Sequence, residues 1–557
     1  MRVGGGKPIA DKLLLVRIIG GMGSIAVSHL AWRLPGGDEL FRDVGFNVGN
    51  GDRVALVGAN GVGKTTLFRL IIGDSVPSEG TISVDGSLGV MHQLVGTADH
   101  SATTVRELLL SIAPEALQNA AADLTAAEAR LDDDPMAYAT AIASWGDAGG
   151  YNAEVLWAEC TTRAFGEAFD DVSDRPLRTL SGGEQKRLAL EALFRSDFDT
   201  LVLDEPDNFL DVPAKRWLER QLIETRKTVV FISHDRELLA AAATKVVTID
   251  ANGAWTHGGS FATYAAAKEH HDSIRQHNQS LFDNEKKRLE DYVKLMRQRA
   301  SMSEAFAAKL KASESKLRHF VEKNERPPDV AVQKIDVQLR GARTGKRAVI
   351  CEQLSIAGLT DPFDAELWYG ERVAVLGGNG VGKSHFLRLL ASSSLDGAPT
   401  AGDGAVGHEG LARLGSGVLP GLFHQTHEHP EWKGRELVEI LHDLDVLLGP
   451  AMGMLRRYEL QVCARQTFET LSGGQQARFQ ILLLELSGAT LLLLDEPTDN
   501  LDLVSAEALE HGLAQFNGTV ITVTHDRWFL RGFDRFLVFG DDCAVTDHTT
   551  LPATWAD

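Results

Sequence analysis

Two glycine-rich loops, each followed by a lysine and a hydroxyl residue, occur in this chain of 557 residues. The first is Gly58-Ala-Asn-Gly-Val-Gly63-Lys64-Thr65, and the second is Gly377-Gly-Asn-Gly-Val-Gly382-Lys383-Ser384. Glycines let backbone N–H groups approach a phosphate closely, and the lysine adds a positive charge for the β- and γ-phosphates. Both loops are therefore predicted to bind ATP. The predicted ATP contacts here are Gly58, Asn60, Gly61, Gly63, Lys64, Thr65, Thr66, Gly377, Asn379, Gly380, Gly382, Lys383, Ser384 and His385.

Acidic and histidine residues follow each loop at the ends of apolar runs. Leu201-Val-Leu and Leu491-Leu-Leu-Leu each lead into Asp-Glu-Pro, and a histidine follows a further apolar run in each half. The aspartate and the loop hydroxyl are suited to Mg²⁺, while the next glutamate is suited to orient the attacking water as a base. The histidine is predicted to contact the γ-phosphate. The predicted catalytic residues are Glu205, Glu496, His234 and His525, and the predicted Mg²⁺ ligands are Thr65, Asp204, Ser384 and Asp495.

A Leu-Ser-Gly-Gly sequence stands before each acidic pair and predicts a helix start. Helix N-termini offer backbone N–H donors to phosphate, so both motifs are expected to contact ATP. The residues concerned are Ser181, Gly182, Gly183, Ser472, Gly473 and Gly474. Gln93 and Gln425 are further predicted contacts, chosen by their approximate distance after the loops, that would link the nucleotide to a helical region.

The elements that position these residues are duplicated along the chain. Ser181 and Ser472, Asp204 and Asp495, and His234 and His525 are each 291 residues apart, whereas Lys64 and Lys383 are 319 apart. The second half is thus 28 residues shorter between loop and Ser-Gly-Gly motif. Short apolar runs such as 53–57, 228–232, 372–376 and 519–523 fit buried parallel strands. The predicted fold class is α/β, with two tandem nucleotide-binding domains.

A charged helical segment separates the two halves. Residues 262–298 contain no proline or glycine, 300–303 interrupt the pattern, and a second helical run follows from 304 to about 324. This predicts an antiparallel hairpin with Met302 and Phe306 near its tip. Between Glu285 and Arg347 there are 17 Lys/Arg and 9 Asp/Glu, a net charge of +8 in a chain of net charge −21. The candidate RNA contacts are Lys286, Lys287, Arg288, Lys294, Arg297, Arg299, Lys309, Lys311, Lys316 and Arg318.

Composition narrows the class of protein. A hydrophobic content of 44% and a charged content of 24% are ordinary for a globular protein, and no run of about 20 apolar residues occurs. The four cysteines form no Cys-x-x-Cys pair, which fits a reducing cytosol and a cytoplasmic location. The expected divisions are an N-terminal extension that is disordered or a mis-assigned start (1–21), a first ATPase domain (22–260), a helical linker (261–345) and a second ATPase domain (346–557).

Together, the tandem ATP motifs and the charged linker resemble the ABC-F subfamily of ATP-binding cassette proteins. The stretches 204–211 and 495–502 are similar to that family's Asp-Glu-Pro-Thr-Asn-His-Leu-Asp motif and depart from it at four positions. The resemblance implies that each Ser-Gly-Gly motif completes the opposite cassette's ATP site, so that a monomer closes its own ATP sandwich. It also implies ribosome binding at the E site, with the linker reaching large-subunit rRNA and P-site tRNA. The departures are Asp207, Phe209, Asp499 and Asn500 in these stretches, and His385 after the second loop.

The biological role is left open between three interpretations. The second half is similar to actinobacterial members labelled as macrolide or lincosamide resistance proteins, which favours protection of the ribosome from large-subunit antibiotics. A housekeeping ABC-F translation factor that gates elongation is the first alternative. The ATPase subunit of an exporter, working with a separately encoded membrane partner, is the second.

Overall fold

The computed structural model describes residues 23–34, 36–92, 104–302, 306–324, 326, 335–393, 407–424 and 429–556. Two compact units divide the chain: one contains 1–256 with 333–557, and the other is His257–Val332. We call residues 23–256 the first cassette and 335–556 the second cassette. The predicted extension at 1–21 and the predicted ATP contacts Gln93 and Gln425 lie outside the described residues.

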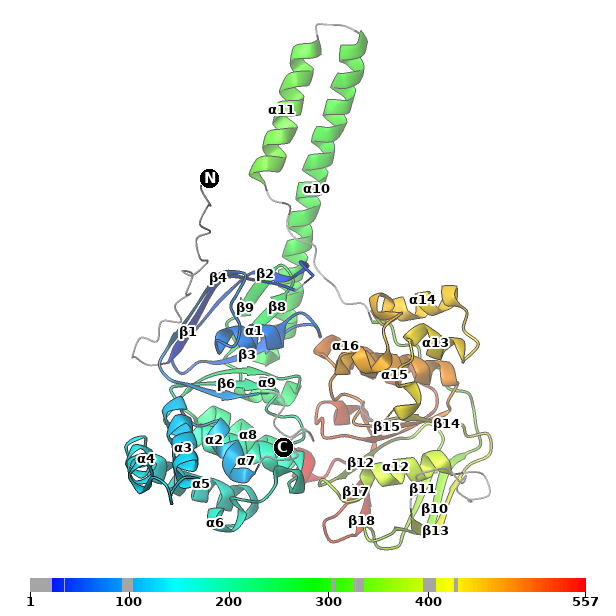
Figure 1. Cartoon of the computed structure of the whole chain (residues 1–557). Helices are drawn as coiled ribbons and strands as arrows, with labels where there is room; N and C mark the ends of the chain where they lie inside the picture. The colour runs from blue at the N-terminus through cyan, green and yellow to red at the C-terminus, as the bar shows by residue number, and fades with distance from the viewer. Residues whose placement is uncertain are drawn as a thin grey trace, which may run out of the picture. The chain divides into compact units, whose positions relative to one another are not determined.

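The first cassette is built on a six-stranded sheet in the order β5-β6-β7-β3-β8-β9 (Figure 1). β5, β6, β7, β3 and β8 run parallel, and β6 and β7 are buried along their whole length, as their continuous apolar sequences predict. An antiparallel sheet of order β2-β1-β4 lies beside it. The strands are β1 (Ser24–Arg33), β2 (Glu39–Val48), β3 (Arg53–Val57), β4 (Glu79–Asp85), β5 (Leu88–Met91), β6 (Thr200–Asp204), β7 (Thr228–Ile232), β8 (Lys245–Asp250) and β9 (Gly253–His257).

The second cassette repeats this plan. Its six-stranded sheet has the order β14-β15-β16-β12-β17-β18, parallel except for the antiparallel β17–β18 pair, with a second sheet of order β11-β10-β13. The predicted α/β fold with two tandem cassettes is confirmed. The strands are β10 (Arg347–Ile356), β11 (Phe363–Trp368), β12 (Arg372–Gly377), β13 (His408–Leu414), β14 (Pro420–Phe423), β15 (Leu491–Asp495), β16 (Thr519–Val523), β17 (Arg535–Phe539) and β18 (Val545–His548).

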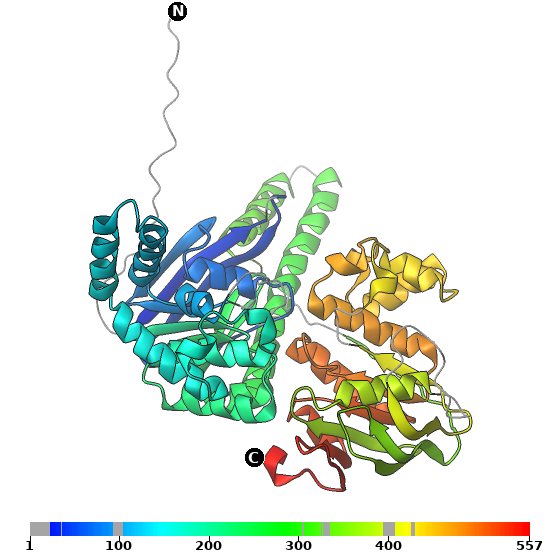
Figure 2. The same ribbon diagram turned by 60° about the horizontal axis from the view of Figure 1, so that its bottom comes forward.

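Matching helices begin at the predicted motifs in both cassettes. They are α1 (Lys64–Ile71), α7 (Gly182–Arg195) and α8 (Val212–Glu224) in the first, and α12 (Lys383–Ser392), α15 (Gly473–Ser487) and α16 (Leu503–Gln515) in the second. The first cassette also has α9 (Arg236–Ala242), where the second has a short 3-10 helix at Phe529–Gly532. The helices between the fifth strand and the Ser-Gly-Gly motif differ, because the first cassette has a cyan group of helices (Figures 1 and 2) where the second has a shorter set. These are α2 (Val105–Ser111), α3 (Glu115–Glu128), α4 (Pro135–Asp147), α5 (Gly150–Phe165) and α6 (Phe169–Val172), against α13 (Leu437–His442) and α14 (Leu448–Arg457).

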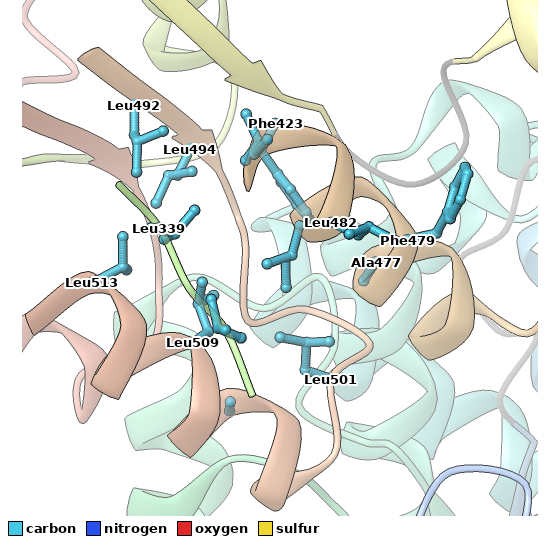
Figure 3. Packing of buried hydrophobic residues seen from close by; sticks show 14 of the residues in the cluster. Leu339, Phe423, Ala477, Phe479, Leu482, Leu492, Leu494, Leu501, Leu509 and Leu513 are labelled. Atoms are coloured by element: carbon cyan, nitrogen blue, oxygen red, sulfur yellow. The ribbon is translucent and has the colours of Figure 1, made fainter. Parts of the chain in front are cut away.

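The core of the second cassette shows how the sheet is held. Leu492 and Leu494 of β15 are 1% exposed, and Figure 3 shows them on the same side of the strand, near Leu339. Leu509 and Leu513 of α16 close the same cluster. Alternate strand residues share one face, so this side of the sheet is sealed by apolar contact while Asp495 ends the strand at its edge. Burial of such side chains contributes roughly 1.5–3 kcal/mol each.

The unit His257–Val332 is a helical hairpin of α10 (Tyr264–Met302) and α11 (Ala307–Lys323) (Figure 1). Leu289, Val293 and Met296 are buried at helical spacing, and Phe282 stacks on Phe320 with ring centroids 5.1 Å apart. The predicted helix break at 300–303 starts too early, because α10 continues to Met302. Alanine, serine and methionine carry no strong helix-breaking tendency, so these residues do not end the helix.

None of the helices in the described ranges combines the length and the apolar character needed to cross a bilayer.

Candidate ATP sites

Each phosphate loop lies between a central strand and a helix N-terminus. Gly63 and Gly382 precede α1 and α12 with φ of 101° and 100°, which is the left-handed region that favours glycine. The Lys64 ammonium donates to the carbonyls of Gly58 (2.8 Å) and Ala59 (3.2 Å) of its own loop. Lys383 likewise donates to the carbonyls of its loop, at 2.9 and 2.6 Å. Both lysines are buried, and burial lowers the pKa of each.

The predicted catalytic glutamates leave the ends of β6 and β15 in the same unusual backbone conformation. Glu205 has φ 48° and Glu496 has φ 47°, a left-handed geometry that strains residues other than glycine and occurs at functional sites. Each glutamate N–H donates to the carbonyl that ends the neighbouring strand, at 2.9 Å to Ile232 and 3.0 Å to Val523. The strain is therefore held in place by the sheet in both cassettes.

The side chains around the two glutamates differ. The Asn208 amide donates to Glu205 Oε2 at 2.7 Å. The corresponding residue of the second cassette is Asp499. Burial of Glu496 is the larger cause, and the negative charge of Asp499 the next, that raise the pKa of Glu496 well above its usual range. Glu496 Oε2 accepts a hydrogen bond from the His525 N–H at 3.1 Å.

The predicted Mg²⁺ ligands fit a hard divalent cation. Ser384 Oγ donates to Asp495 Oδ1 at 3.0 Å, which brings the two predicted ligands of the second cassette together. In the first cassette Asp204 Oδ1 is buried and has no hydrogen-bond partner among the residues described. Burial, with the adjacent Glu205, raises the pKa of Asp204 to about 7. Hydroxyl and carboxylate oxygens are the ligands that Mg²⁺ prefers, so both places suit this ion.

Both predicted switch histidines are partly buried and lie close to their loop lysines. Burial, followed by the charge of Lys64, lowers the pKa of His234 to about 3. Burial and Lys383 likewise lower the pKa of His525 well below its usual range. Each ring is therefore neutral at pH 7 and can offer one N–H donor and one acceptor. Trp555, near the end of the chain, stacks on His525 with ring centroids 5.9 Å apart, a contact that the sequence did not predict.

The Ser-Gly-Gly motifs begin α7 and α15 as expected. Ser181 Oγ accepts from the Glu184 N–H, and Ser472 Oγ accepts from the Gln475 N–H, each within a capping box. The Ser-x-x-Glu/Gln spacing in the sequence is the signal for this arrangement. The capping serines anchor the helix starts, which leaves the backbone N–H groups of the following glycines at the positive end of each helix.

The two cassettes contact each other through these motifs. The Asn60 N–H donates to Asp502 Oδ2 at 2.9 Å, and the Asn60 side-chain amide donates to the Asn500 carbonyl at 2.9 Å. A Cβ added at Gly474 would lie 2.0 Å from the Asn60 amide nitrogen and 2.8 Å from the Asn500 carbonyl oxygen, so a larger residue would disturb this contact. In the other direction, the Asn379 amide donates to the Phe209 carbonyl at 3.3 Å. Each phosphate loop thus meets the opposite cassette.

A cavity of about 270 Å³ lies between the two sets of motifs. Both catalytic glutamates and both switch histidines line it, together with Ser181 and Gly183 of the first Ser-Gly-Gly motif. The structure therefore places predicted site residues of both cassettes around one cavity.

Two partly buried ion pairs, not predicted from the sequence, also join the cassettes. Arg236 pairs with Glu510, and Arg527 pairs with Glu219. These pairs are related by the same 291-residue repeat, so they form a symmetric clamp. Each arginine directly follows a His-Asp sequence, but no local pattern names a partner about 300 residues away.

The remaining predicted residues lie in three places. His385 is exposed on α12, whereas Thr65 and Thr66 are half-buried at the start of α1. In the hairpin, the Phe306 ring lies 6.0 Å from the Arg299 guanidinium and 5.6 Å from the Lys309 ammonium, within the range of cation–π contact. The side chain of Met302 lies outside the described residues. Of the ten candidate RNA contacts, nine are exposed and Lys286 is half-buried.

Some candidate RNA contacts form ion pairs within the hairpin. Arg288 pairs with Glu285 at 2.7 Å, and Arg297 pairs with Glu314 at 2.8 Å. Exposed pairs of this kind are weak, so a stronger phosphate contact can replace them.

Comparison with known proteins agrees with this architecture. The family model described as "ABC transporter" matches residues 41–208 and 360–499. A protein named "Antibiotic resistance protein" from Mycobacteroides abscessus is 49% identical over 94% of this chain and 99% of its own length. The energy-dependent translational throttle protein EttA of Haemophilus influenzae is 27% identical over 91% of this chain and 90% of its own length.

A solved structure titled "Model of ribosome-bound archaeal Pelota and ABCE1" shares the fold. Its TM-score is 0.55 at 18% identity, and the match covers 94% of this chain and 78% of that one. At this identity the likeness concerns the fold alone. With the family model and the relatives above, the chain belongs to the ATP-binding cassette family, in its ABC-F branch, and it is an ATPase.

Proposed function

We propose that this ABC-F ATPase binds the ribosome in an ATP-closed form and protects it from antibiotics that act on the large subunit. The observation that carries the proposal is the 49% identity, over almost the whole length of both chains, to a protein named "Antibiotic resistance protein". The ribosomal E site is the proposed place of binding, and the cytoplasm is the proposed location. The ATP sandwich closes within one chain, so the working form is a monomer.

Hydrolysis in this proposal uses one phosphate loop with the opposite Ser-Gly-Gly motif. ATP would be held by the two loops, and Mg²⁺ by Thr65 with Asp204 and by Ser384 with Asp495. When bound, Mg²⁺ supplies positive charge that neutralises the phosphate oxygens. The catalytic glutamates orient water, and the neutral histidines hydrogen-bond the γ-phosphate. The bonds from Asn60 to Asp502 and Asn500 support this composite arrangement.

The hairpin is the proposed contact with large-subunit rRNA and P-site tRNA. Its basic residues are mostly exposed and available to phosphate groups, whose neutralisation supplies much of the affinity of RNA-binding proteins. The cassettes have a strongly acidic balance, which discourages RNA contact elsewhere. Phe306 and Met302 are proposed to act at the tip.

Co-sedimentation with purified 70S ribosomes tests the binding step. The Glu205→Gln/Glu496→Gln protein is pelleted with ribosomes in ATP or in ADP, and the proposal predicts pelleting only in ATP. Absence of pelleting in both nucleotides would contradict it and direct attention to a membrane partner, as in an exporter ATPase. The parent chain in ATP is the matched control, and it should pellet transiently because hydrolysis releases it.

The contribution of the hairpin is tested by the triple charge reversal Lys287→Glu/Lys294→Glu/Arg318→Glu. We expect weaker pelleting and a salt dependence whose log–log slope falls by about 1 for each lost phosphate contact. A control with three reversals at exposed arginines of the first cassette, Arg42, Arg130 and Arg163, changes the net charge equally. Equal loss in both proteins would show that the hairpin is not the contact.

A second candidate, a translation factor that gates elongation, is supported by the similarity to the translational throttle protein EttA. Both candidates predict ribosome binding, so drug dependence separates them. Protection predicts that the chain restores translation only when an antibiotic is present. A gating factor instead changes translation with the ATP-to-ADP ratio in the absence of any drug.

A further inference from the structure

Lys215 on α8 is a buried lysine that contacts both cassettes. Its ammonium lies 3.0 Å from Asp235 Oδ2 in the first cassette and 3.5 Å from the His525 carbonyl oxygen in the second. The side chain belongs to no predicted motif. At the corresponding position of the second cassette, 291 residues later, stands Ala506, so the contact has no symmetric equivalent.

The two groups that Lys215 contacts belong to the two switch-histidine loops. Asp235 directly follows His234, and its Oδ1 accepts from the N–H groups of Glu237 and Leu238 at 2.9 and 3.1 Å, which caps α9. The other contact is the backbone of His525 itself. One ammonium group therefore touches the loop next to each predicted γ-phosphate contact.

The surroundings keep this lysine charged. Burial alone would lower the pKa of Lys215, but the carboxylates of Asp235 and then Asp207 raise it above its ordinary value. Asp499 and Asp526 add to the same field. The described lining of the 270 Å³ cavity includes Lys215 together with six acidic residues: Glu205, Asp207, Asp235, Glu496, Asp499 and Asp526.

Two of those carboxylates are also specific to one cassette. Asp207 corresponds to Thr498, and Asp499 corresponds to Asn208. Both depart from the sequence that ABC-F proteins show at these positions. Lys215, Asp207 and Asp499 therefore form a charged cluster at positions where the two cassettes have different residues. The cluster lies at the cassette interface, and it has no equivalent related by the repeat.

We propose that Lys215 is a positioning residue that couples the two ATP sites by bridging the loops of His234 and His525. It rests on the proposed hydrolysis at two composite sites. Within the described part of the chain, the polar contacts of Lys215 are Asp235 and the His525 carbonyl, so it acts through the position of the histidines. A shift of one switch loop is transmitted through the ammonium group to the other loop.

The test measures steady-state ATPase activity of Lys215→Ala in three backgrounds: the parent chain, Glu205→Gln and Glu496→Gln. Each single glutamine variant leaves hydrolysis to one site. We expect kcat to fall by about 10- to 100-fold in both single-site backgrounds while KM changes less than about twofold, because loss of positioning affects the transition state more than binding. In the parent chain, cooperativity in ATP concentration should fall to a Hill coefficient of about 1.

A second variant separates bridging from simple charge balance. Lys215→Ala/Asp207→Thr/Asp499→Asn gives each position the residue of the opposite cassette and removes two of the carboxylates whose charge the lysine offsets. The proposal predicts that this triple variant folds as well as the parent chain and still shows reduced kcat and lost cooperativity. Recovery of both would overturn the proposal, because charge balance would then be the whole role of Lys215.

Two controls keep the outcome specific. Lys227→Ala removes a half-buried lysine of the first cassette, which donates to the Phe198 carbonyl at 2.8 Å, and its kcat should match that of the parent chain. Lys215→Arg should recover part of the activity, because it restores a cation in reach of both loops. An effect of Lys215→Ala confined to one single-site background would overturn the coupling role. Absence of ATPase activity in the parent chain would instead contradict the hydrolysis on which the inference rests.

Discussion

The first and second ATP sites share their backbone conformation and their motif residues, but several side chains around these motifs differ. Glu205 and Glu496 share a left-handed φ of 48° and 47°, and Gly63 and Gly382 share φ of 101° and 100°. The side chains behind this backbone diverge. Lys186 and Lys215 in the first cassette correspond to Ala477 and Ala506 in the second, while the Asn208 partner of Glu205 is replaced by Asp499 beside Glu496.

The comparison shows that the two cassettes keep the same backbone scaffold but carry different charged side chains around their ATP sites. The strained backbone of the two strand-end glutamates is stabilised by hydrogen bonds to the neighbouring strand, which both cassettes make. The parts that tune chemistry depend on single side chains, which can change without disturbing the sheet. We therefore expect both sites to close at the same time around ATP but to hydrolyse it at different rates.

The largest expected effect removes the feature that both sites share. Glu205→Gln/Glu496→Gln should reduce ATP turnover by at least about 100-fold, because a positioned base typically contributes 10²- to 10⁴-fold. Phosphate release measured at saturating ATP tests this. Glu128→Gln, an exposed position on α3, is the control and should turn over normally. Unaltered turnover in the double variant would remove both glutamates from the mechanism.

The next effect tests the symmetry of the clamp between the cassettes. Arg236→Ala and Arg527→Ala each leave a partly buried glutamate without its partner. Breaking a fully buried ion pair costs about 3–5 kcal/mol, so we expect a smaller loss of about 1–3 kcal/mol here. Thermal denaturation and the ATP dependence of closure should show similar losses in both variants. Arg163→Ala breaks an exposed i,i+4 pair with Glu159 and should leave the melting temperature unchanged. Very different losses at Arg236 and Arg527 would show that the interface is not symmetric.

A smaller and one-sided effect is expected from Lys186. Its ammonium donates to the Glu205 carbonyl, and the side chain is fully buried; burial lowers its pKa to about 8. Lys186→Ala should lower turnover about tenfold in the Glu496→Gln background, where only the first site works, because it loosens the strained glutamate. The same substitution in the Glu205→Gln background should change turnover little. Equal losses in both backgrounds would contradict the one-sided role.

The smallest expected effect exchanges the neighbours of the two glutamates. Asp499→Asn places an amide where Asn208 holds Glu205, and it removes a carboxylate beside Glu496. Turnover at the second site, measured in the Glu205→Gln background, should rise a few-fold, because the amide donor orients the base. The reverse change, Asn208→Asp in the Glu496→Gln background, should lower turnover at the first site. If turnover changed in the same direction in both variants, the amide would not be what orients the catalytic glutamate.

Much of each site followed from the sequence because its parts are local. The glycine loop, the Asp-Glu pair and the switch histidine each sit directly after a buried apolar strand, and β3, β6 and β7 end at one edge of a parallel sheet. The capping boxes at Ser181 and Ser472 likewise have a signature of three-residue spacing.

The missed residues act across the cassettes, where spacing gives no signal. Lys215 contacts His525, which is 310 residues away, and Arg527 contacts Glu219. A lysine on an amphipathic helix such as α8 is ordinarily a solvated residue, so the sequence around Lys215 does not indicate its contact with the opposite cassette. The hairpin was predicted by composition, but its first helix was ended too early, because residues 300–302 continue the helix without any breaking residue.

The most direct test of the central claim is cell-free translation with purified components. The chain is added with ATP to reactions inhibited by a macrolide or a lincosamide, next to the hairpin variant Lys287→Glu/Lys294→Glu/Arg318→Glu. We expect that the parent chain restores translation, that the hairpin variant does not, and that neither changes translation without drug. Translation that stays inhibited although the chain sediments with ribosomes in ATP would contradict a protective role.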